Sequence, residues 1–291
     1  MSNPTAKILA FAPIVLTSWI AFAGSLTKTV YDFDDTLIST TAYVQIYKSG
    51  ADAKTASAQD IQRVSTAMWA EVRAELGKDG EYKDWTLNPE FSFQNFTGVP
   101  GTNAFLGHIK ETLATKTAAQ WKAPMWSDFV KQLDNSFTAN DVFILTARSS
   151  TAADVLEGFQ YLQTQGLIKN LIPGENIFAV SDPTLRLKSN PTLVLAKEKS
   201  EVSKSLIMQE MLDELEKNAQ LNSTQKATWA FYDDDYANFA KARDTLVPLA
   251  SQRWPHVQIT IGYVGVVRPN TPEHEVVVRP AALMTRMKKA N

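Results

Sequence analysis

The stretch KTVYDFDDTLIS, residues 28–39, places three carboxylates, Asp32, Asp34 and Asp35, within four positions directly after β-prone residues. Neighbouring carboxylates repel one another and raise one another's pKa, so this arrangement is costly unless a cation lies among them or the turn is fully solvated. Taken alone it also fits an ordinary turn or helix cap, because Asp favours both positions. Residues elsewhere in the chain distinguish the two interpretations.

The composition limits the chemistry that is available. The chain has 291 residues, 44% of them hydrophobic and 21% charged, which is typical of a globular protein with a sizeable core. It has no cysteine, and its three histidines lie far apart without metal-ligand spacing. The net charge of -2 does not indicate the overall basic character that is typical of proteins that bind nucleic acid. Carboxylates are therefore left to carry any catalysis.

The first residues have the features of an export signal. Lys7 precedes a short apolar run, and residues 21–23, Ala-Phe-Ala, fit the small-x-small pattern of a cleavage site. The run is interrupted by Pro13 and is short for a membrane span. We expect residues 1–23 to be a signal peptide cleaved near Ala23, and the mature protein to be periplasmic or secreted, with no membrane attachment. An uncleaved anchor and a helix belonging to the fold are the alternatives.

Strands and helices alternate across residues 120–265, which indicates an α/β fold with a doubly wound, Rossmann-like parallel sheet. The strands are expected within residues 26–33, 141–150, 176–183, 227–235 and 257–265, and HEVVVR, residues 274–279, predicts a further edge strand. Helices are expected within residues 151–167, 200–218 and 238–250.

Residues 40–118 are predicted to form a mainly helical insertion. Apolar residues at helical spacing predict one helix across residues 55–76, ending at Gly77. The residues on its buried face are Ile61, Val64, Met68, Val72 and Leu76. The insertion is also rich in aromatic residues, which form either a substrate pocket or the insertion's own core: Tyr43, Tyr47, Trp69, Tyr82, Trp85, Phe93 and Phe96.

Polar side chains follow three of the expected strands. Asp32 and Asp34 follow the first, Thr146 ends the second, and Asp233 to Asp235 end another. In open α/β sheets the ligand site lies beyond the carboxyl ends of the strands. If these strands are adjacent and parallel, five acids and a hydroxyl converge at one edge of the sheet, which is much rarer than a single acidic turn.

The sequence resembles the haloacid dehalogenase superfamily, specifically its aspartate-based phosphatases. The first motif of that family, Asp-x-Asp-x-Thr/Val-Leu after an apolar strand, is matched by residues 32–37. The second, a strand ending in Ser or Thr, is matched at Thr146, and the fourth, a strand ending in Asp-Asp, at Asp233 and Asp234, with Asn238 following. The resemblance implies a core of residues 24–39 and 119–291 and a cap formed by residues 40–118.

The resemblance also implies roles for the acids. Asp32 would be the nucleophile, and Asp34 the general acid and base. Mg²⁺ would be held by the Asp32 carboxylate, the Asp34 backbone carbonyl and Asp233 or Asp234. The presence of Asp34 favours phosphate chemistry, because family members that cleave carbon–halogen bonds lack the second acid of the first motif. Asp35 stands at the family's variable position and is interpreted as a surface acid.

The family's third motif is a lysine near the start of the helix before the last acidic strand. We favour Lys204, because apolar residues follow it at helical spacing and leave it at the head of a buried face; Lys199 and Lys197 are the alternatives. Thr146 and this lysine would hold the phosphoryl oxygens. Thr36 and Arg148 are predicted to contact substrate, although an arginine at the position of Arg148 is often structural.

The sequence therefore predicts a magnesium-dependent phosphomonoesterase that acts on a small phosphorylated substrate through an aspartyl-phosphate. A polynucleotide-end phosphatase is an alternative within the same superfamily, which the acidic balance disfavours. A catalytically silent binding protein that kept the sheet is an alternative from another class. The sequence leaves the oligomeric state open.

Overall fold

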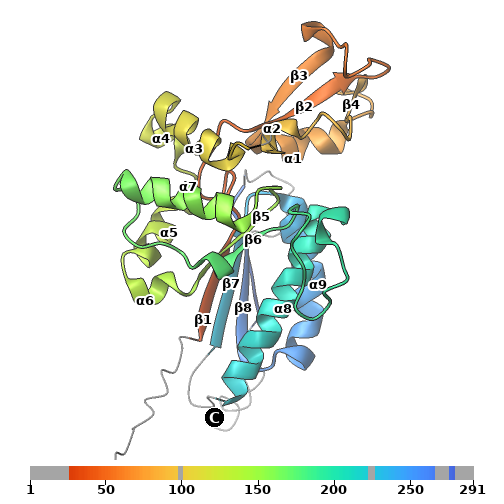
Figure 1. Ribbon diagram of the computed structural model, residues 1–291. Coiled ribbons are helices and arrows are strands. Elements are labelled where there is room, and N and C mark those ends of the chain that lie inside the picture. The colour runs from red at the N-terminus through yellow and green to blue at the C-terminus, as the bar shows by residue number, and fades with distance from the viewer. Residues whose placement is uncertain (1–25, 98–100, 222–226, 266–274, 279–291) are drawn as a thin grey trace, which may run out of the picture.

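A computed structural model describes residues 26–97, 101–221, 227–265 and 275–278 of the chain (Figure 1). Within these residues, a mixed six-stranded sheet has the order β6-β5-β1-β7-β8-β9. The first five strands of that order are parallel, and β9 is antiparallel to β8 at the edge. The strands are β1 (Thr27–Tyr31), β5 (Val142–Thr146), β6 (Ile177–Ala179), β7 (Ala227–Asp233), β8 (Val257–Tyr263) and β9 (Glu275–Val278). The predicted parallel strands and the predicted edge strand are confirmed.

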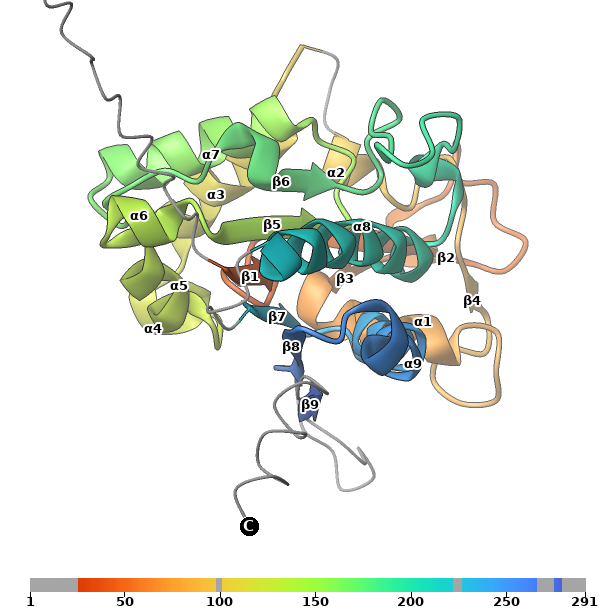
Figure 2. The same ribbon diagram turned by 90° about the horizontal axis from the view of Figure 1, so that it is seen from below.

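Helices cover both faces of this sheet, as Figure 2 shows. One face packs against α8 (Ser200–Leu221) and α9 (Tyr236–Arg253), and the other against α3 (Ala104–Thr115), α5 (Trp126–Leu133) and α7 (Ala152–Thr164). Because side chains alternate along a strand, Val30 and Tyr31 of β1 enter the two different cores. The α/β expectation is therefore confirmed. The shorter elements are α4 (Ala118–Trp121), α6 (Ser136–Ala139), η2 (Gly174–Asn176) and η3 (Leu195–Lys197).

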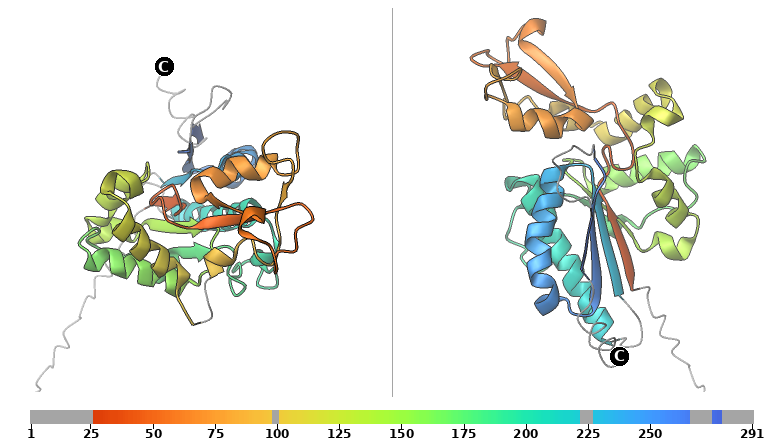
Figure 3. Two further views of the ribbon diagram at one scale, coloured as in Figure 1. Left: turned by 90° about the horizontal axis from the view of Figure 1, so that it is seen from above. Right: turned by 180° about the vertical axis from the view of Figure 1, so that it is seen from behind.

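A second, smaller body lies beyond the carboxyl ends of the parallel strands (Figures 1 and 3). We call it the accessory unit, residues 43–97. In it β2 (Tyr43–Lys48) pairs antiparallel with β3 (Ile61–Ser65) and β4 (Trp85–Thr86). Its remaining elements are η1 (Ala58–Asp60), α1 (Thr66–Glu75) and α2 (Gln94–Thr97). It has a core of its own, in which Ile46, Val64 and Val72 are buried and Trp69, Tyr82 and Trp85 pack around them.

The prediction of one helix across residues 55–76 is wrong, and residues 40–118 contain a three-stranded sheet beside their helices. Residues 61–65 form a strand, and the helix begins only at Thr66. Met68, predicted to lie on the buried face of that helix, is 51% exposed. Ile61 and Val64 also suit a sheet, and pairing of their backbone with β2 satisfies its hydrogen bonds there. This tertiary pairing overrides the helical spacing.

Helix α3 lies within residues 40–118 but packs with the main sheet. Its Phe105 and Ile109 are fully buried in the same core as Phe33 and Phe159. They contact α7 at Gly158, where a Cβ would stand 2.5 Å from the Phe105 ring and 2.7 Å from Ile109. Glycine at residue 158 is therefore required by the close approach of the two helices.

Residues 1–23, the predicted signal peptide, lie outside the described residues. No helix within the described ranges has the length and apolar character needed to cross a bilayer.

Gly158→Ala should destabilise the protein by about 1–3 kcal/mol, because the added methyl group overpacks the contact between α7 and α3. The measurement is the urea midpoint of unfolding at constant m-value. Gly107→Ala on α3 is the matched control, since a Cβ there meets no atom within 4 Å. It should raise stability by up to about 1 kcal/mol, because alanine favours helix over glycine. Equal effects of the two variants would contradict the described packing.

Candidate active site

The three strand ends named in the sequence analysis meet at one place. β1 pairs in parallel with β5 on one side and β7 on the other. Asp32 directly follows β1, Thr146 ends β5 and Asp233 ends β7. All three side chains are buried, with exposed fractions of 6%, 1% and 0%. The expected convergence of strand ends is therefore observed.

Lys204 of α8 lies among the acids. Its Nζ donates to Asp32 Oδ1 at 2.6 Å and to Asp233 Oδ2 at 2.7 Å, and the lysine is 1% exposed. Burial works against the charged lysine, but Asp233 and Asp32 outweigh it and raise its pKa. Lys204 is therefore a fixed cation that offsets part of the negative charge of the cluster.

The two acids at the end of β7 are held by different partners. Asp233 accepts from Asn238 Nδ2 at 3.1 Å on both oxygens and from the Asp235 backbone N–H at 2.8 Å. Thr36 Oγ1 donates to Asp234 Oδ1 at 2.9 Å and accepts from the Asp234 backbone N–H at 3.0 Å. Asn238 lies in the first turn of α9, so the start of that helix orients Asp233.

The acids form a set that can hold a divalent cation. Asp32, Asp233 and Asp234 each offer one carboxylate oxygen, and these oxygens lie within 4.8 Å of one another. Burial raises the pKa of Asp32 and of Asp234 well above the ordinary value, and the neighbouring carboxylates add to this. A divalent cation would favour their ionised forms, and carboxylate oxygens are the donors that Mg²⁺ and Ca²⁺ prefer.

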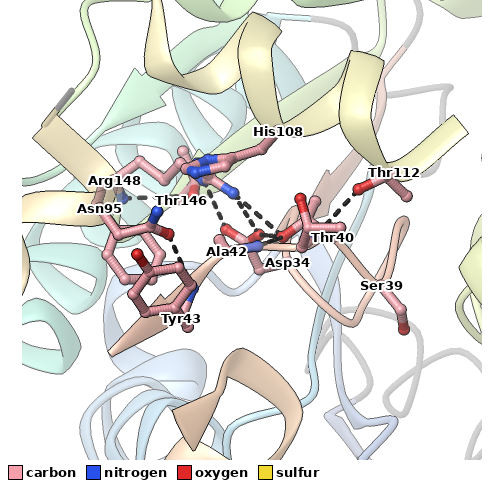
Figure 4. A network of polar contacts seen from close by, with 12 residues as sticks. Asp34, Ser39, Thr40, Ala42, Tyr43, Asn95, His108, Thr112, Thr146 and Arg148 are labelled. Carbon is pink, nitrogen blue, oxygen red and sulfur yellow. Dashed lines mark hydrogen bonds and ion pairs between the residues drawn. The ribbon is translucent and has the colours of Figure 1, made fainter. Parts of the chain in front are cut away.

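Asp34 belongs to a second network, drawn in Figure 4. The Arg148 guanidinium donates two parallel hydrogen bonds to the Asp34 carboxylate, from Nε to Oδ2 at 2.8 Å and from Nη2 to Oδ1 at 2.6 Å. Thr40 Oγ1 donates to Asp34 Oδ1 at 2.7 Å. Burial alone would raise the pKa of Asp34, but Arg148 outweighs it and lowers this pKa, so Asp34 is held as a carboxylate.

His108 supports the far side of Arg148. Its Nδ1 lies 2.7 Å from Arg148 Nη1, and because a guanidinium can only donate, Nδ1 is the acceptor. The ring is therefore neutral, with its proton on Nε2. Burial, together with the charge of Arg148, lowers the pKa of His108 to about 4. The rings of Phe96 and Phe105 lie 5.2 Å and 5.1 Å from the Arg148 guanidinium carbon, which completes its enclosure.

Residues of both networks, including Asp32 and Asp34, line one cavity of about 1460 Å³ between the main sheet and the accessory unit. Asp32, Thr146 and Lys204 line it from the sheet side, and Trp69 and Phe93 from the accessory unit. The two sides are joined by an ion pair between Arg73 Nη2 of α1 and Asp235 Oδ1 at 2.9 Å. Asp235 also caps α9, accepting from the Ala237 backbone N–H.

The structure distinguishes the three candidate lysines, since only Lys204 contacts the acids while Lys197 and Lys199 are exposed. Thr36 is fully buried and its hydroxyl is engaged by Asp234. Arg148, 2% exposed, lines the cavity but directs its guanidinium at Asp34 and His108.

The interpretation of Asp35 as a surface acid is wrong. Asp35 is 9% exposed, and burial raises its pKa. Its φ of 55° is in the left-handed region, which Asp tolerates better than most residues. The backbone there turns sharply, and the Asp35 N–H donates to the Ile38 carbonyl at 2.9 Å. The turn carries the side chain inward.

Sequence reasoning missed His108, Thr40 and the Arg73–Asp235 pair. His108 lies on an amphipathic helix with no distinctive local motif, and its position depends on how α3 docks against α7. Arg73 is one charged residue on a helix whose start was misplaced. The partners of His108 and Arg73 are far away in the sequence, so spacing carries no signal for them.

No protein-family model, curated protein or solved structure matches the chain.

His108→Asn should flatten the acid dependence of stability. The pKa of His108 is about 4 in the folded protein and 6.5 ordinarily, so between these values the unfolded chain binds a proton that the folded chain does not. The free energy of unfolding therefore falls as pH falls through this window. Asparagine keeps an acceptor for Arg148 but does not titrate. Urea unfolding across the window should show a shallower decline for the variant, whereas equal slopes would contradict a buried neutral His108.

Proposed function

We propose that this chain is a magnesium-dependent phosphomonoesterase of the haloacid dehalogenase superfamily, acting through an aspartyl-phosphate. The observation that carries the proposal is Lys204, buried between Asp32 and Asp233 at the carboxyl ends of adjacent parallel strands and open to a large cavity. A scaffold protein has no need for this costly arrangement of buried charges. In this proposal, the accessory unit is the cap.

The nucleophile is the Asp32 carboxylate. One of its oxygens attacks phosphorus, an O–P bond forms, and the bond from phosphorus to the leaving oxygen breaks. Lys204 holds Asp32 Oδ1 in place and offsets its charge as the anionic phosphate approaches. Thr146, which lines the same cavity as Asp32, would donate a hydrogen bond to a phosphoryl oxygen.

Asp32, Asp233 and Asp234 would hold the cation, which would supply positive charge to the transferring phosphoryl group. The resemblance adds the Asp34 backbone carbonyl as a further ligand. Asn238 and Thr36 orient Asp233 and Asp234 for this purpose. Such orienting partners commonly matter nearly as much as the ligands themselves.

Asp34 has two tasks with opposite protonation requirements. Its carboxylate form, which Arg148 stabilises, accepts a proton from the water that attacks phosphorus and releases Asp32 and phosphate. Protonation of the leaving oxygen in the first step requires the acid form of Asp34. In that step the hydrogen bonds from Arg148 to Asp34 have to break, while His108 still accepts a hydrogen bond from the guanidinium.

The Arg148–Asp34 pair also favours a second candidate, a silent binding protein. A carboxylate held permanently by a buried arginine cannot donate a proton. Such a protein would bind cation and phosphate at the same cluster but would release no alcohol. Both candidates predict binding of a cation and phosphate at the cluster, but only the phosphatase predicts hydrolysis of the phosphate ester.

Asp32→Asn should abolish magnesium-dependent hydrolysis of para-nitrophenyl phosphate, because an amide is a poor nucleophile for phosphorus. The measurement compares wild type and variant with magnesium and with chelator. Asp35→Asn is the matched control, since it makes the same change three residues away without touching the cavity lining, and it should keep most of the activity. Activity that survives in Asp32→Asn would refute the assignment of the nucleophile.

Asp34→Asn should slow the cleavage of esters with poor leaving groups more than the cleavage of esters with good ones. A nitrophenolate departs without a proton, whereas an alkoxide needs one, and general acid catalysis contributes about 10²–10⁴-fold. Alcohol release in a single turnover should therefore fall by about 10²–10⁴-fold for an alkyl phosphate. It should fall much less for para-nitrophenyl phosphate, which would show a burst of nitrophenol. Equal losses for both esters would count against Asp34 as the general acid.

A further inference from the structure

A row of aromatic side chains leads from the acids into the accessory unit. The ring of Phe96 packs at 6.4 Å from that of Phe93, and Phe93 meets Trp69 edge-to-face at 5.8 Å. All three line the cavity that contains Asp32 and Asp34. Phe93 is 39% exposed, so part of its ring is open to the cavity that it lines.

This row begins at the residue that holds the proposed general acid. The Arg148 guanidinium carbon lies 5.2 Å from the Phe96 ring, and the same guanidinium grips Asp34. Asp34 has to face the oxygen of the leaving alcohol. Among the walls of the cavity, the one formed by Phe96, Phe93 and Trp69 begins beside Arg148, the partner of Asp34, and so is the wall available to the rest of that alcohol.

The charges around the row disfavour an anionic leaving group. Glu71, Glu75 and Glu81 line the cavity from the accessory unit. Its arginine on this wall, Arg73, is paired with Asp235 at 2.9 Å. A second phosphate or a carboxylate on the alcohol would approach the carboxylates of this wall, since Lys199 lines the cavity from beside α8 and not from the accessory unit, whereas an uncharged ring would meet aromatic faces and edges.

We propose that the Phe96–Phe93–Trp69 row is a leaving-group subsite that selects phosphomonoesters whose alcohol carries an uncharged planar ring. The inference rests on the proposed function, since the reacting phosphate is placed at Asp32. Phe93 is the main specificity residue, because it lies in the middle of the row and is the most accessible of the phenylalanines in it.

The test compares 3-phenylpropyl phosphate with propyl phosphate, two primary esters of similar leaving-group reactivity that differ by the ring. Wild type with magnesium should favour the ring ester in kcat/KM by about 10-fold or more, given the usual contribution of stacking on aromatic side chains. A carboxylate added to the ring should remove most of this advantage. Equal kcat/KM for the ring and ringless esters would overturn the subsite while leaving the phosphatase proposal intact.

Phe93→Ala should lower the ratio of the two kcat/KM values by about 3- to 10-fold. Phe137→Ala is the matched control, because Phe137 is 74% exposed on α6 and lies outside the cavity lining, and its ratio should equal that of wild type. A wild-type ratio in Phe93→Ala would overturn the assignment of Phe93.

A binding measurement separates failure of the subsite from failure of the function. The ligands are 4-phenylbutylphosphonate and butylphosphonate, which replace the ester oxygen by carbon and cannot be hydrolysed. Calorimetry with magnesium should show about 10-fold tighter binding of the ring ligand to wild type, and less preference in Phe93→Ala. Ring preference without turnover of any ester would support the subsite and refute the phosphatase. Equal binding of both ligands would refute the subsite.

Discussion

The burial of Lys204 between Asp32 and Asp233 is the interaction on which the rest of the site depends. Lys204 belongs to α8, Asp233 ends β7 and Asp32 directly follows β1, so the ion triad joins the helix layer to the ends of two neighbouring strands. Breaking a buried ion pair by removing one partner typically costs about 3–5 kcal/mol, because the remaining charge is left uncompensated. Here the loss of the lysine would leave two buried carboxylates beside a third, Asp234. Within the described part of the chain, Lys204 is the cation that offsets part of this concentration of negative charge.

The two acids of the first motif are treated in opposite ways by their surroundings. Asp32 has a raised pKa despite Lys204, because burial and two neighbouring carboxylates act on it. Asp34 has a lowered pKa, because a bidentate arginine outweighs its burial. Two residues apart in the sequence and beyond the end of β1, they enter two networks: Asp32 contacts Lys204 of α8, whereas Asp34 contacts Arg148, whose other partner is His108 of α3. Pairs of carboxylates whose environments differ in this way are typical of acid–base and nucleophilic sites. This asymmetry supports different roles for Asp32 and Asp34 in the proposed reaction.

Much of the main sheet was predictable, because buried parallel strands are continuous apolar runs such as residues 142–145 and end in polar residues that share one edge. The same logic predicted the meeting of Asp32, Thr146 and Asp233. It failed at residues 61–65, where apolar spacing fits both a helix and a strand and only pairing with β2 decides. It failed at Asp35, because a left-handed turn reverses the direction of the side chain. His108 could not be foreseen, since its contact with Arg148 spans 40 positions and depends on the docking of α3.

The most direct test of the account is to identify the phosphorylated residue. Asp34→Asn should slow breakdown of the intermediate, so rapid mixing with para-nitrophenyl phosphate and magnesium, followed by acid quench and peptide mass spectrometry, should find one phosphoryl group on Asp32. The label should be absent from Asp32→Asn and should disappear when chelator is added before mixing. Alcohol release with no phosphoryl group on the protein, or with the label on another residue, would contradict the account.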